Sequence, residues 1–143
     1  MAHPAWLRDF ETRLRVELEP LADRLRSSFR NDKFVVDANP WGQATGADGY
    51  IIALSCLLSG VADDVADNVA LEISFRSVST APTAIADVCW GHPSGFIEAE
   101  WCPGVDAVKF DDAAQNDFFM FLPTLKVAFE ESVRRRKPHE SHV

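Results

Sequence analysis

The stretch Val69-Ala-Leu-Glu-Ile-Ser-Phe-Arg-Ser-Val78 decides the fold, because its apolar and polar side chains alternate. Successive side chains of a strand point to opposite faces of the sheet, so a period of two predicts a strand with one buried face and one face in water. The side chains expected on the buried face are Val69, Leu71, Ile73 and Phe75, and those expected in water are Ala70, Glu72, Ser74 and Arg76. We therefore expect a sheet that is covered on one side.

The residues that follow this strand predict a β-hairpin around the turn Gly91-His-Pro-Ser94. Its strands are expected at residues 83–90 and 95–102, both rich in apolar and β-branched side chains. We expect Trp90 to pair with Gly95 across this four-residue loop.

That register decides where the hairpin carboxylates lie. It turns Ile97 and Trp101 to the buried face, and it places Asp87 opposite Glu98 in water, with Glu100 on the same strand and face. A shift by one residue would move the carboxylates to the buried side, so this register is favoured. Like charges directly opposite each other are unfavourable, and nothing in the fold demands them.

Upstream, residues 33–38 and 50–58 predict two further strands. The intervening residues 39–49 contain one proline and three glycines, which predict a loop. The connections between strands are too short for the crossovers that parallel strands require. We therefore expect about five strands in a mainly antiparallel meander.

Helices are predicted at both ends of the chain. Residues 5–30 carry a stripe of apolar side chains at helical spacing, interrupted by Pro20, where we expect a kink or a break. A second helical region is expected from Asp111 or Asp112, as N-cap, to about Arg136. The prediction is one α+β domain over residues 1–137, with both helical regions on one face of the sheet and a disordered tail at 138–143.

The composition of the chain argues against several classes of protein, namely nucleic-acid-binding, membrane-spanning and secreted proteins. The chain has 143 residues, of which 47% are hydrophobic, and a net charge of −8. Such a charge makes nucleic acid a poor partner, since phosphate binding requires a basic surface. The chain has no apolar run long enough for a membrane span and no secretory signal, and its odd number of cysteines indicates reduced thiols. We expect a cytoplasmic protein.

The excess negative charge is concentrated in the predicted sheet. Residues 31–112 carry a net charge of −10, whereas the segments before and after them each carry +1. One interpretation is an acidic face that binds a basic protein, and the other is a surface that serves solubility. The candidate contacts of the acidic face are Glu72, Asp87, Glu98 and Glu100, with Trp41 as an aromatic anchor.

Sequence motifs name no catalytic residue, no metal ligand and no cofactor. Cys89 and His92 form a conceivable thiol–imidazole pair, but no third residue that would orient the imidazole is evident. The cysteines and histidines lack the spacings of metal sites, and the glycines do not match a phosphate-binding loop. The sequence therefore favours a protein that is not an enzyme.

The run Phe118-Phe-Met-Phe-Leu122 has five consecutive large apolar residues, which cannot all face one side of a helix. Some of them must meet another surface, either the other helix or a second copy of the chain. The second option predicts a homodimer through Phe119, Met120 and Phe121.

The size, the acidity and the order helix–strands–helix are loosely similar to those of small secretion chaperones and of toxin-immunity proteins. The likeness is one of layout and carries over no residues. The link from Val78 to Thr83 is also too short for the helix that those chaperones place between strands. The leading hypothesis is a small acidic protein-binding domain that contacts its partner through the acidic sheet face or an apolar helix. The alternative is a small-molecule-binding protein or enzyme with a pocket between sheet and helices.

Overall fold

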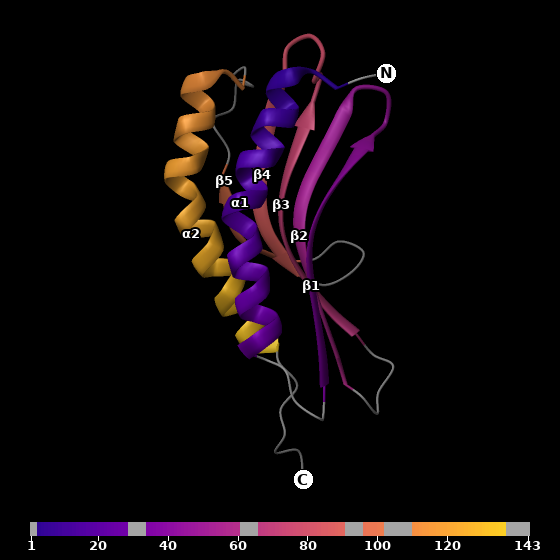
Figure 1. Ribbon diagram of the computed structural model, residues 1–143, viewed down its shortest axis with the longest axis vertical. Helices are drawn as coiled ribbons and strands as arrows, with labels where there is room; N and C mark the ends of the chain where they lie inside the picture. Colours follow the sequence, from indigo (N-terminus) through magenta and orange to yellow (C-terminus); the bar gives the residue numbers. More distant parts are fainter. Residues whose placement is uncertain (1–2, 29–33, 61–65, 91–95, 102–109, 137–143) are drawn as a thin grey trace.

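The computed structural model describes residues 3–28, 34–60, 66–90, 96–101 and 110–136. Two helices and five strands follow one another along the chain (Figure 1). They are α1 (Ala5–Ser28), β1 (Phe34–Thr45), β2 (Gly49–Gly60), β3 (Ala66–Arg76), β4 (Thr83–Trp90), β5 (Phe96–Trp101) and α2 (Asp112–Arg136). The expected tail at 138–143 lies outside the described residues.

The five strands form one antiparallel sheet in the order β1-β2-β3-β4-β5. Each strand pairs with the next along the chain, as the short connections require. An N-terminal helix, an antiparallel meander of five strands and a C-terminal helix packed on the sheet confirm the predicted α+β class.

Both helices cover the same face of the sheet and lie side by side, beginning at the same end of the molecule (Figure 1). Ion pairs join them along their length: Lys126 Nζ lies 3.3 Å from Glu17 Oε2, and Arg24 Nη2 lies 2.8 Å from Glu130 Oε1. Neither helix, over its described residues, is long and apolar enough to cross a membrane.

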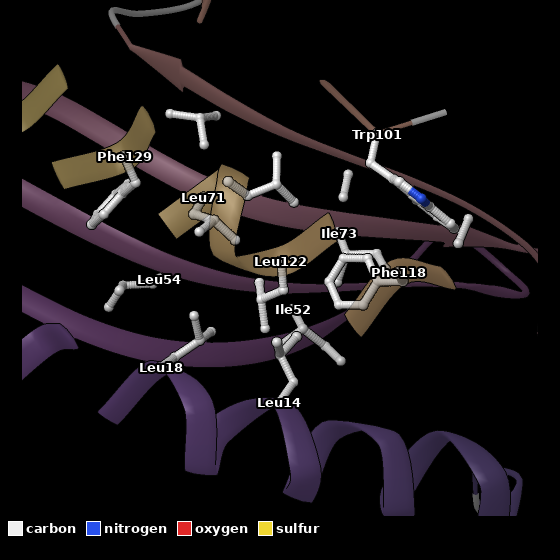
Figure 2. Close-up of a cluster of buried hydrophobic side chains, with 14 of the residues drawn as sticks. Leu14, Leu18, Ile52, Leu54, Leu71, Ile73, Trp101, Phe118, Leu122 and Phe129 are labelled. Atoms are coloured by element: carbon white, nitrogen blue, oxygen red, sulfur yellow. The ribbon is translucent and has the colours of Figure 1, made fainter. Parts of the chain in front are cut away.

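The core fills the space between the helices and the sheet, as Figure 2 shows. Leu14 and Leu18 of α1 and Phe118 and Phe129 of α2 point toward the sheet and are buried. The sheet contributes its alternate residues, which are buried as the alternation of β3 predicts: Ile52, Leu54, Leu71 and Ile73. Burial of these apolar side chains is the main favourable contribution to folding.

The loop expected at residues 39–49 is wrong, because β1 continues to Thr45 and only a short turn separates it from β2. Pro40 is tolerated because β1 is an edge strand, where a proline need not remove a ladder bond. Gly42 leaves room for the ends of two side chains, since a Cβ there would lie 2.4 Å from Glu11 Oε2 and 2.6 Å from the Tyr50 hydroxyl. The turn itself uses Gly46, whose φ of 61° favours glycine.

Pro20 and Pro123 lie inside α1 and α2, and both helices are assigned as continuous through them. The break considered at Pro20 is therefore absent, and both prolines are exposed on the outer side of the helical layer. Asp111 is the N-cap of α2, because its Oδ1 accepts a hydrogen bond of 3.0 Å from the Ala114 amide, as the sequence predicted.

The five apolar residues at 118–122 of α2 pack in different environments. Phe118 and Leu122 are fully buried in the core. Phe119 packs on Phe10 of α1. The Arg13 guanidinium lies over the Phe119 ring, with its Cζ 3.7 Å from the ring centroid. Phe121 packs against the edge of the core. Met120 alone points outward, with 82% of its surface exposed.

Candidate functional site

The candidate site lies on the face of the sheet turned away from the helices, which we call the open face. No described helix or strand covers it (Figure 1). The strand register identifies the residues of this face. Directly paired residues point to the same side of the sheet, and the neighbours of a core residue along its strand point to the opposite side.

Three carboxylates form a line across adjacent strands of the open face. Glu72 of β3 is paired with Asp87 of β4, and Asp87 is paired with Glu100 of β5. Directly opposed side chains have Cβ atoms about 4.5–5.5 Å apart, which brings like charges close together. We call Glu72, Asp87 and Glu100 the acidic row.

Trp41 lies in the same transverse line as the acidic row. It is paired with Ala53 of β2, and Ala53 is paired with Glu72. The Trp41 indole is half-buried, and its Nε1 donates a hydrogen bond of 2.8 Å to Ser55 Oγ. Trp41 therefore lies in a strand rather than in the expected loop, and four of the five candidate binding residues share one line across the open face.

Glu98 is the exception, and its expected position is wrong. Trp90 pairs with Phe96 rather than with Gly95, and a β-bulge between Val88 and Cys89 shifts the register by one further residue. As a result, Asp87 faces Glu100 instead of Glu98. Glu98 reaches the helical side of the sheet, where its Oε2 lies 2.6 Å from Arg135 Nη2 of α2. The ion pair removes Glu98 from the repulsion that it would meet beside Asp87.

The pairing of Trp90 with Phe96 brings Ile97 to the open face, opposite Cys89, whereas the sequence placed it in the core. Ile97 is 59% exposed, and Ile85 of β4 is 46% exposed on the same face. Sequence reasoning did not name either as a contact residue. An isoleucine at a position expected in water, as Ile85 is, was the available signal, but nothing local marks this pairing.

Burial and repulsion both act on the acidic row. Burial raises the pKa of Glu72, and the charge of Asp87 raises it further. Burial also raises the pKa of Asp87; a hydrogen bond from the Cys89 thiol opposes that rise, and the charge of Glu100 adds to it. Asp87 Oδ1 is shielded from solvent and accepts no hydrogen bond among the described residues. The fold thus holds Glu72 and Asp87 where their charged forms are disfavoured.

Cys89 lies beside the acidic row, with its sulfur and oxygen atoms of Glu72 and Asp87 all within 4.8 Å of one another. Two carboxylates and a thiol are donors that zinc accepts, although no spacing in the sequence indicated a metal site. Burial, with the charges of Glu72 and Asp87, raises the pKa of Cys89 to about 12. The thiol therefore stays protonated near neutral pH, which disfavours a nucleophilic role; His92, its suggested partner, lies outside the described residues.

The space between sheet and helices is packed in the described residues, and a shallow hollow of about 620 Å³ lies instead at one end of the domain. Pro4, Trp6, Pro82 and Phe110 are among its lining residues. Two polar residues there have structural tasks, since Asp111 caps α2 and Ser79 donates to Asp48. The hollow lined by the described residues thus lies at this end of the domain, whereas the alternative expectation was a pocket between sheet and helices.

Comparison of the chain with protein-family models, with curated proteins and with solved structures finds no match. The fold and the site thus define an α+β domain with a two-helix layer on one side of its sheet and an acidic open face on the other.

Proposed function

We propose that this chain is a non-enzymatic, cytoplasmic protein-binding domain that engages a basic protein partner through its open face, in the manner of a small chaperone or an immunity protein. The observation that carries the proposal is the acidic row, whose carboxylates are directly opposed across three strands, with Glu72 and Asp87 half-buried. Residues kept in an unfavourable environment are characteristic of functional sites. The free thiols of Cys56 and Cys89 agree with a reducing compartment.

The edges of the sheet are poorly suited to partner binding, which favours the open face. On β1, Pro40 lacks the amide donor that an added strand would use. The carbonyl oxygen of Ala38 already accepts a hydrogen bond from the Arg26 guanidinium. On the other edge, β5 carries a bulge opposite Val88 and Cys89 of β4. Prolines and bulges are means by which proteins discourage strand addition.

Site-specific crosslinking tests which surface meets the partner. A photoreactive residue is placed at Ile85 or Ile97 on the open face, and at Val127, which is 58% exposed on α2, for comparison. After irradiation in cells that make the protein, we expect adducts from positions 85 and 97 and none from 127. Adducts from 127 alone would contradict the open-face proposal and favour the helices.

Charge removal tests the electrostatic part, with the crosslinked partner as ligand. The variant Glu72→Gln, Asp87→Asn, Glu100→Gln should bind at least about tenfold more weakly than the wild type, and wild-type affinity should fall as salt rises. The matched control Asp9→Asn, Glu19→Gln, Glu131→Gln removes three exposed charges from the helices. Affinity that is flat with salt, or equal losses in both variants, would contradict a role for the acidic row.

Self-association through the helical layer is a second candidate, favoured by the exposed apolar side chains of Val16, Met120 and Val127. Phe119 and Phe121 pack within the domain and leave Met120 as the exposed member of the predicted interface. A homodimer of this kind should sediment at twice the monomer mass at tens of micromolar, and Met120→Ser should shift it toward monomer. A wild-type protein that sediments as a monomer would contradict it.

A further inference from the structure

We infer that the partner segment presents an arginine to the acidic row, with an aliphatic side chain on each side of that arginine. The inference rests on the proposed function, because it names the chemistry of the group that the open face takes up. Its basis is the order of charged and apolar side chains along β4 and β5.

The acidic row lacks a cation within the described residues. None of the described ion pairs includes Glu72, Asp87 or Glu100. Arg76 follows Glu72 by four residues on β3, a distance of about 13 Å along the strand, and cannot reach it directly. A positive group from outside the chain would offset the mutual repulsion of the three carboxylates.

The burial of the row favours a guanidinium over an ammonium group. Glu72 and Asp87 are half-buried, so a cation that pairs with them must give up water. Guanidinium is more weakly hydrated than ammonium, and its planar fork directs several donors at once toward neighbouring carboxylates. Carboxylates on successive strands, which lie about 4.8 Å apart, match a group with donors on more than one side.

The apolar side chains on either side of the row supply the rest of the recognition. Ile85 precedes Asp87 by two residues on one side, and Ile97 lies opposite Cys89, two residues beyond Asp87 on the other. Two residues of a strand span about 6.7 Å, so an isoleucine lies about that far from the row on each side. Both are exposed, and the pairing of Ile97 with Cys89 turns Ile97 to this face.

This order of apolar, acidic and apolar groups is complementary to an arginine with aliphatic side chains about 6–7 Å away on both sides. An extended segment has that spacing at positions two residues before and after the arginine. Aliphatic contacts would exclude water from the ion pair, which strengthens it.

Selection from a displayed library of random linear peptides, carried out with the wild-type protein in the presence of a chelator, tests the inference. We expect enriched peptides that contain an arginine between aliphatic residues. In the strongest synthetic peptide, Arg→Lys should weaken binding several-fold and Arg→Gln at least about tenfold. On the protein, Asp87→Asn should weaken binding about tenfold, and Ile85→Ser and Ile97→Ser several-fold each, whereas Asp9→Asn and Val127→Ser should leave it unchanged.

The outcomes separate this inference from the proposed function. Peptides that lose affinity with Ile85→Ser or Ile97→Ser but contain no arginine, or tolerate Arg→Lys without loss, would overturn the inference and leave the open face as the binding surface. A library that yields no binder, or binders unaffected by every open-face substitution, would contradict the proposed function itself. Circular dichroism of each variant checks that a loss of binding does not reflect a loss of folding.

Discussion

Replacement of Phe118 by alanine lowers the free energy of unfolding by about 3–5 kcal/mol, the cost of removing a large aromatic side chain from a packed core. The Phe118 ring is fully buried between the helices and the sheet. Its centroid lies 5.5 Å from that of Phe10 in α1 and 5.4 Å from that of Trp101 in β5. The substitution thus opens a cavity where α1, α2 and the sheet meet. Urea denaturation followed by circular dichroism measures the loss.

Met120→Ala is the matched control for this prediction, because it truncates a large apolar residue of the same helix that is 82% exposed. Its effect should stay within about 0.5 kcal/mol, as is usual for surface positions. A cost below about 1 kcal/mol for Phe118→Ala would show that the two helices do not share this core.

The fold class could be predicted because its determinants are local and periodic. Each determinant can be recognised from a short stretch of sequence: the alternation in β3, the apolar stripe of α1 and the short connections between strands. The loop predicted at residues 39–49 failed for a non-local reason. Pro40 and Gly42 disfavour a strand locally, but Pro40 lies on a sheet edge and Gly42 lies under Glu11 and Tyr50, which come from other elements.

The candidate site, like the fold, could be predicted where local alternation decides it, but not where a contact distant in sequence does. Alternation alone placed Glu72, Asp87 and Glu100 on the solvent side of their strands, and the structure aligns them in one row. The error at Glu98 lies in the hairpin register, because Trp90 pairs with Phe96 and a bulge follows. Glu98 instead pairs with Arg135, which lies 37 positions further along the chain, and no local pattern reports such a contact.

The apolar run of α2 illustrates how a run of large side chains can pack on two sides within one domain. Five large side chains cannot share one helix face, which was the basis for expecting another surface. In the structure, Phe119 uses the neighbouring helix α1 as that surface and Phe121 uses the edge of the core. The first of the two explanations offered by the sequence therefore accounts for most of the run.

Neutralising the two most buried carboxylates of the acidic row should stabilise the protein while weakening partner binding. We expect Glu72→Gln combined with Asp87→Asn to raise the free energy of unfolding at pH 7 by about 2 kcal/mol, a typical gain for several optimised surface charges. The substitutions remove one like-charge contact between β3 and β4 and another between β4 and β5. They also remove the cost of keeping the charged forms away from water.

The pH dependence of this gain follows from the direction of the pKa shifts. In the folded state the pKa values of Glu72 and Asp87 are raised above their ordinary values, mainly by burial. Groups with raised pKa values contribute stability that is fully present below their unfolded pKa values, about 4, and is lost as the pH rises through the folded values. The wild type is therefore penalised at pH 7, and the advantage of the double variant should shrink as the pH falls and vanish near pH 3.5.

Urea denaturation of both proteins at pH 7, 5 and 3.5 measures this advantage. The control Asp9→Asn with Glu131→Gln removes two exposed charges from the helices, so it reports how much any reduction of the net charge of −8 stabilises the fold. The gain should exceed that of the control at pH 7. A double variant that is no more stable than the control, or whose advantage grows toward low pH, would show that the acidic row is not strained. The inference that these carboxylates are held in place for binding would then lose its thermodynamic support.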